Sequence, residues 1–96
     1  MLEVKLILYS AMREIVGEGK FIMNISEGSS VKELIRSLFN QYEEKFRERY
    51  GSLFKKDLED RLLVFVNDNS IYSFDGFETK LKDKDKVEIL EPILGG

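Results

Sequence analysis

The stretch SVKELIRSLFNQYEEKF, residues 30–46, gives the clearest secondary-structure signal in the chain. Ser30 and Glu33 have the Ser-x-x-Glu spacing of a capping box, which predicts that a helix begins at this serine. Apolar residues then recur every three or four positions, as in one buried stripe on a helix of about four turns. The stripe consists of Val31, Leu34, Ile35, Leu38, Phe39, Tyr42 and Phe46. The stretch therefore predicts one long amphipathic helix.

Two strands and a short helix are predicted before this long helix. From residue 2 to residue 9 the apolar residues first alternate with charged ones and then become continuous. This pattern is typical of a strand that begins half exposed and ends more buried. Residues 11–16 fit a short helix, because glycines at positions 17 and 19 stop it. Residues 21–25 alternate again and predict the second strand.

Three kinds of segment follow the long helix. Residues 43–61 are rich in charge and carry apolar residues at helical spacing, which indicates an irregular helical excursion. Residues 62–66 are continuously apolar and are the best candidate for a central strand. Residues 71–74 fit a short strand or an extended segment. Residues 87–90 predict a last strand, which Pro92 ends because proline cannot donate to a sheet ladder.

This order of elements predicts an α+β fold. We expect a mixed sheet of four or five strands with the one long helix packed on one face. The 96 residues fit a single domain, 1–96. Residues 92–96 offer no evident way to pair or pack, so we expect them to form a flexible C-terminal tail.

Composition argues against several functional classes. The chain has no cysteine and no histidine, which removes thiolate nucleophiles and the commonest transition-metal ligand. We expect no catalytic residue, no metal site and no bound cofactor. A net charge of −3, with basic residues interleaved among acidic ones, argues against nucleic acid as a partner. No apolar run approaches the ~20 residues of a membrane helix, and early charges argue against a signal peptide, so we expect a cytoplasmic protein.

The final Gly95-Gly96 is the feature that packing explains least. Glycines without side chains could pass through a narrow channel into the nucleotide pocket of another protein. There the carboxylate of Gly96 could reach the α-phosphate of ATP. The resulting acyl-adenylate has a good leaving group and could be attacked by sulfide or persulfide, which gives a thiocarboxylate. The alternative is an ordinary chain end, where small residues collect.

Four stretches of the sequence carry a resemblance to a known family. They are residues 11–17 (AMREIVG), 30–34 (SVKEL), 63–67 (LVFVN) and 81–96, which ends in Leu94-Gly95-Gly96. Together they resemble the MoaD/ThiS-type ubiquitin-like sulfur carriers, whose relatives include archaeal ubiquitin-like modifiers. Residues 13–17 are similar to MoaD, the small subunit of molybdopterin synthase, more than to ThiS, the thiamine carrier. Asp83-Lys84-Asp85 stands where the family often has Asp-Gly-Asp, which we expect to change only the backbone geometry of the turn.

The resemblance implies a β-grasp fold and assigns roles to several residues. Gly96 is implied as the site of adenylation and thiocarboxylation. Ile93, Leu94 and Gly95 are implied to thread into the partner. Tyr9, Ile71 and Leu90 match an apolar partner-binding patch on the exposed sheet face, although ordinary core packing explains the same three residues equally well.

The resemblance also implies two protein partners. One is a ubiquitin-activating-type adenylating enzyme, similar to MoeB and ThiF, which uses ATP. The other is a MoaE-like large catalytic subunit of molybdopterin synthase, to which the carrier would donate sulfur for molybdenum cofactor biosynthesis without catalysing a reaction alone. Three alternatives stay open: a ubiquitin-like modifier joined to lysines through Gly96, a thiamine-pathway carrier, and a β-grasp binding module without carrier chemistry.

Overall fold

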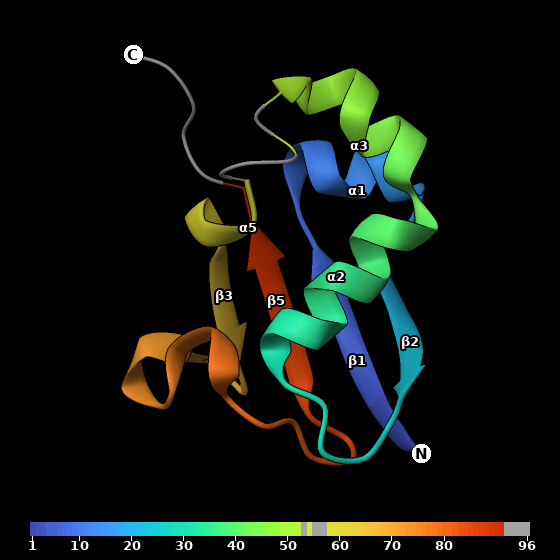
Figure 1. Cartoon of the computed structure of the whole chain (residues 1–96). Helices are drawn as coiled ribbons and strands as arrows, with labels where there is room; N and C mark the ends of the chain where they lie inside the picture. Colours follow the sequence, from blue (N-terminus) through green and yellow to red (C-terminus); the bar gives the residue numbers. More distant parts are fainter. Residues whose placement is uncertain (53, 55–57, 92–96) are drawn as a thin grey trace.

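A computed structural model describes residues 1–52, 54 and 58–91, which form a sheet crossed by the helix α2 (Figure 1). The helical elements are α1 (Ser10–Val16), α2 (Val31–Gln41), α3 (Glu43–Tyr50), α5 (Leu58–Arg61) and the 3₁₀ turns η1 (Ile71–Ser73) and η2 (Gly76–Glu78). The strands are β1 (Leu2–Leu8), β2 (Lys20–Ile25), β3 (Leu63–Val66), β4 (Asn69–Ser70) and β5 (Lys86–Leu90). Within the described ranges, no helix is both long enough and apolar enough to cross a membrane.

The strand β5 lies at the centre of the sheet, whose order is β2-β1-β5-β3-β4. It runs parallel to β1, with Val87 opposite Leu6, and antiparallel to β3, with Ile89 opposite Val64. The predicted mixed sheet is therefore confirmed. The strand predicted over residues 62–66 is present as β3 and is paired on both sides, but β5 takes the central position and β3 lies next to the edge strand β4.

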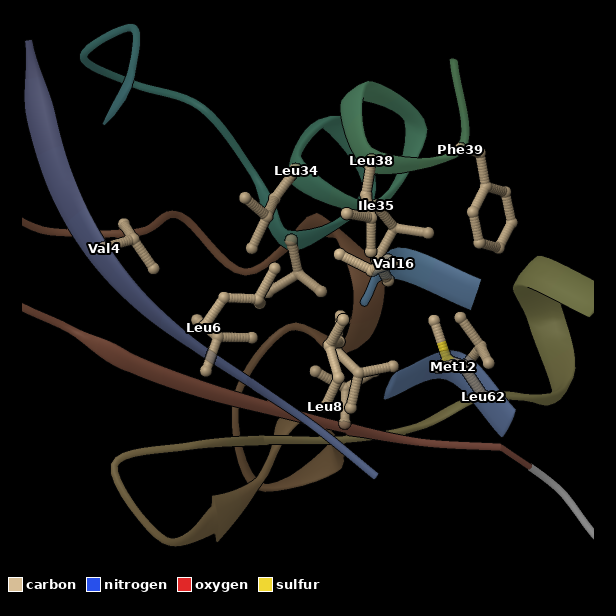
Figure 2. Close-up of a cluster of buried hydrophobic side chains, with 14 of the residues drawn as sticks. Val4, Leu6, Leu8, Met12, Val16, Leu34, Ile35, Leu38, Phe39 and Leu62 are labelled. Carbon is tan, nitrogen blue, oxygen red and sulfur yellow. The ribbon is translucent and has the colours of Figure 1, made fainter. Parts of the chain in front are cut away.

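The core lies between the sheet and α2. Leu6 and Leu8 of β1 are buried and lie below Leu34 and Leu38 of α2 in Figure 2. Each such leucine contributes about 1.5–3 kcal/mol through the apolar surface that it removes from water. The apolar stripe predicted on the helix thus faces the alternate residues of β1, as an α+β fold requires.

The predicted capping box is present at the start of α2. The Ser30 hydroxyl oxygen accepts a hydrogen bond from the backbone N–H of Glu33 at 3.2 Å. In return, Glu33 Oε1 accepts one from the backbone N–H of Ser30 at 3.0 Å. The bond from Ser30 lowers the pKa of the Glu33 carboxyl. The first turn of the helix is therefore fixed by side chains that the sequence signal identified.

The prediction of one long helix is wrong, because α2 ends at Gln41 and α3 begins at Glu43. Between them Tyr42 adopts φ −120° and ψ 31°, outside the helical region. The turn places the Phe46 ring 4.7 Å from the Phe39 ring, measured between centroids. Seven residues of a continuous helix advance about 10 Å, so a break between these positions lets the two rings meet.

Residues 71–73 form the 3₁₀ turn η1, so the predicted strand or extended segment over 71–74 is wrong. The Ser70 hydroxyl accepts a hydrogen bond from the backbone N–H of Tyr72 at 3.2 Å. A serine that binds the backbone two residues ahead offers it an alternative to strand pairing. Ile71 at the start of this turn is fully buried.

The turn before β5 is fixed by two carboxylates. Asp83 Oδ1 accepts a hydrogen bond from the backbone N–H of Glu3 at 2.8 Å. Asp85 Oδ2 accepts a hydrogen bond from the backbone N–H of Lys82 at 2.8 Å. Between them Lys84 has a φ of 71°, in the left-handed region that favours glycine. The turn therefore ties the start of β1 to the approach to β5.

We expect Ser30→Ala to lower the free energy of unfolding by about 1 kcal/mol, because the backbone N–H of Glu33 loses its acceptor. Urea denaturation of both proteins measures the difference. Ser37→Ala is the matched control, since Ser37 is exposed within the same helix and alanine is the better helix former. An equal effect of the two substitutions would contradict a capping role for Ser30.

Candidate functional site

The face of the sheet opposite α2 carries a cluster of apolar side chains. Alternation along β3 turns Val64 into the core and leaves Leu63 51% exposed. Leu63 is paired in register with Leu90, the last residue of β5. Tyr9 is 38% exposed just after β1, the other neighbour of β5. We call Tyr9, Leu63, Phe65 and Leu90 the apolar patch.

A shallow hollow of about 260 Å³ forms part of this surface. Its lining residues are Tyr9, Phe65, Asp68, Glu88 and Leu90. The Tyr9 hydroxyl donates a hydrogen bond to Glu88 Oε2 at 2.5 Å, which raises the pKa of the tyrosine. Lys86 Nζ lies 2.7 Å from Asp68 Oδ1 and 3.9 Å from Glu88 Oε1. The polar groups thus bind one another, and the apolar groups face solvent.

The structure brings two of the three predicted patch residues together and places the third elsewhere. Tyr9 and Leu90 line the same hollow. Ile71 is fully buried among core residues, so it offers no surface to a partner. The prediction that Ile71 belongs to the patch is therefore wrong. The alternative that the sequence equally allowed, a position in the core, is correct. Whether Tyr9 and Leu90 bind a partner stays a prediction.

Sequence reasoning missed Leu63 and Phe65. Both lie within the continuous apolar run of residues 62–66, which was interpreted as a central strand. The strand β3 buries Val64 and Val66 on one face, together with Leu62 just before it, while Leu63 is exposed and Phe65 is half-buried. Strand periodicity places Leu63 and Phe65 together on one face, but a run in which every residue is apolar carries no signal for which face is exposed.

The predicted modification site lies outside the described residues. Gly96 and the predicted tail residues Ile93, Leu94 and Gly95 follow Glu91, the last described residue. Five fully extended residues span at most about 18 Å. Any group that reacts with Gly96 must therefore come within roughly that distance of Glu91, at the carboxyl end of β5 and beside the apolar patch.

Residues 1–52, 54 and 58–91 contain no group of three or more His, Cys, Asp or Glu side chains placed to hold a metal ion. They also contain no buried side-chain nitrogen or oxygen without a hydrogen-bond partner. Glu59 Oε1 lies 3.3 Å from Arg36 Nε, so this carboxylate forms an ion pair.

A mixed sheet with its last strand in the centre and α2 across one face is a ubiquitin-like β-grasp fold. The model of the ThiS family matches residues 6–96, and the chain belongs to this family. Membership of the MoaD/ThiS-type ubiquitin-like group, expected from the sequence, is thereby confirmed.

Relatives from archaea are similar over almost the whole chain. Small archaeal modifier protein 3 of Haloferax volcanii is 26% identical, over 99% of this chain and 100% of the relative. The solution structure of the Haloferax volcanii HVO 2177 protein has a TM-score of 0.78 at 26% identity, covering 99% of this chain and 87% of that one. The solution structure of small archaeal modifier protein 1 from Methanosarcina acetivorans has a TM-score of 0.73 at 28% identity, covering 100% of this chain and 98% of that one.

A more distant structure is a protein–protein complex of subunits 1 and 2 of the molybdopterin-converting factor from Helicobacter pylori. The matched chain has a TM-score of 0.56 at 22% identity, covering 99% of this chain and 100% of that one. At this identity the similarity shows the fold alone.

We expect Leu63→Ala to change the free energy of unfolding by no more than about 0.5 kcal/mol, and Leu62→Ala to lower it by about 2–5 kcal/mol. The two residues are adjacent and identical, but Leu63 is 51% exposed and Leu62 is 1% exposed. Chemical denaturation of the two variants measures the difference. Similar losses in both would show that Leu63 belongs to the core and not to the apolar patch.

Proposed function

We propose that this chain is a sulfur carrier that acts through the carboxylate of Gly96. The observation that carries the proposal is that β5, the central strand, ends beside the apolar patch and leads directly into the residues before Gly95-Gly96. A partner docked on the patch lies within reach of the terminal carboxylate. Membership of the ThiS family supports the same function.

The proposed chemistry requires only the carboxylate from this chain. An oxygen of the Gly96 carboxylate attacks the α-phosphorus of ATP, and pyrophosphate leaves with the electron pair of the broken phosphorus–oxygen bond. Sulfide then attacks the acyl carbon, and AMP leaves with the electron pair of the carbon–oxygen bond. The product is a thiocarboxylate. Both steps take place in the adenylating enzyme, which binds the ATP.

The apolar patch supplies the docking surface in this proposal. Leu63 and Tyr9 remain exposed, although apolar side chains of this size are normally favoured in the interior. Clustered exposed apolar groups with a polar rim are typical of protein interfaces. We assign the patch to the adenylating enzyme and to the subunit that receives the sulfur, both in the cytoplasm.

The subunit that receives the sulfur is, in this proposal, the large catalytic subunit of molybdopterin synthase. The Helicobacter pylori complex supports the assignment, because there a protein of this fold is joined to a second subunit of a molybdopterin-converting factor. The carrier would then be the small, sulfur-donating subunit in molybdenum cofactor biosynthesis.

The similar archaeal modifier proteins favour a second candidate function. A ubiquitin-like modifier uses the same acyl-adenylate, but the ε-amine of a lysine on a target protein attacks the acyl carbon. AMP leaves, and an isopeptide bond forms. The two functions diverge only after adenylation, so the product identifies which one operates.

We expect the purified chain to gain about 16 mass units when incubated with ATP, its adenylating enzyme and sulfide, because one carboxylate oxygen is exchanged for sulfur. Intact-mass spectrometry measures the gain. A variant that lacks Gly96 and one extended by a residue after Gly96 are the controls, and neither should gain mass.

An unchanged mass, with the enzyme shown to be active on a known carrier, would reject the carrier function and favour a β-grasp binding module. Conjugates to lysines in a cell extract, without a thiocarboxylate, would favour the modifier function.

We expect Leu63→Asp to raise the KM of the adenylating enzyme for the carrier at least about tenfold while kcat stays the same, because the charge disrupts docking and leaves the chemistry intact. Pyrophosphate release at varied carrier concentration measures both constants. Tyr72→Asp is the matched control, since Tyr72 is 67% exposed on η1 and does not line the hollow of the patch. Equal effects of the two variants would contradict docking on the patch.

A further inference from the structure

The chain beyond β5 is contacted by a tyrosine from a distant segment. Tyr50, the last residue of α3, donates its hydroxyl hydrogen to Glu91 Oε2. The pairing of β5 ends at Ile89 on the β1 side and at Leu90 on the β3 side. Glu91 therefore lies just past the paired strand, where this hydrogen bond ties it to α3.

Tyr50 is itself fixed by a group of aromatic rings. Its ring is stacked on Phe46, with centroids 6.3 Å apart and planes 18° apart. Phe46 is fully buried and also contacts Phe39 of α2 at 4.7 Å and Phe54 at 5.8 Å. These contacts hold the tyrosine in a defined position on the domain, at the end of the sheet toward which β5 runs (Figure 1).

The Tyr50 hydroxyl is a persistent donor. The tyrosine is half-buried, and both burial and the hydrogen bond to Glu91 raise its pKa. The hydroxyl therefore keeps its proton at neutral pH. A hydrogen bond to a carboxylate is stronger than one between neutral groups, and a partly buried hydroxyl loses solvation if its acceptor is removed.

We propose that Tyr50 is a positioning residue for the carrier reaction, because its hydroxyl holds Glu91, the residue to which the C-terminal residues 92–96 are joined. The inference rests on the proposed function. It also gives a role to α3, which carries the tyrosine to this point. A fixed starting point lowers the conformational entropy that is lost when the last residues enter the partner.

Tyr50→Phe tests this role, because it removes the hydroxyl and keeps the stacked ring. We expect the KM of the adenylating enzyme for the carrier to rise about five- to tenfold, with kcat unchanged, since the bound state that reacts is the same. Glu91→Ala should reproduce the rise. Glu91→Gln should remain within about twofold of the wild type, since its amide oxygen can still accept the hydrogen bond. Tyr72→Phe is the matched control, because the Tyr72 side chain on η1 is 67% exposed, and it should change neither KM nor kcat.

A second readout does not depend on activity. Relaxation of ¹⁵N amides should show a lower order parameter for the backbone amide of residue 91 in Tyr50→Phe and in Glu91→Ala than in the wild type. If the wild type is not adenylated, the proposed function fails, while relaxation still decides whether Tyr50 fixes Glu91. An unchanged order parameter at Glu91, or an unchanged KM in both variants, overturns the proposal. Glu91→Ala leaves the aromatic rings intact, so it keeps the test valid if Tyr50→Phe does not fold.

Discussion

The parallel pairing of β1 with β5 is the constraint on which the rest of the structure depends. It brings Leu6 and Val87, which lie far apart in the sequence, side by side beneath α2. Because β3 pairs with the other side of β5, the last strand is held from both edges. The chain thus leaves the sheet from a strand that is paired at both edges, and Glu91 follows directly after it.

Local patterns predicted most elements but not where the chain changes direction. The capping box at Ser30 and the alternation in β1 depend on neighbouring residues, so the sequence shows them directly. Periodicity also identified Phe46 as buried. It could not show the break between α2 and α3 at Tyr42, because that break depends on the contact between the Phe39 and Phe46 rings. The segment after Ile71 is only a few residues long, so its pattern did not distinguish a strand from the 3₁₀ turn that the Ser70 hydroxyl caps.

The candidate site was only partly encoded in local sequence. Gly95-Gly96 is visible in the sequence, and Tyr9 and Leu90 followed from the family resemblance. Leu63 was hidden within an apolar run, because sequence alone does not show which face of a strand a second layer covers. The Tyr50–Glu91 contact joins residues that are 41 positions apart, and tertiary packing alone creates it.

The hollow between Tyr9 and Leu90 has a consequence for how another protein would meet this surface. Lys86 lies between Asp68 and Glu88, so the three side chains together keep only a single negative charge before anything binds. Long-range attraction therefore contributes little to the encounter, and removal of apolar surface from water dominates it. An association of this kind changes little with added salt and weakens on cooling, because the hydrophobic effect itself weakens at low temperature.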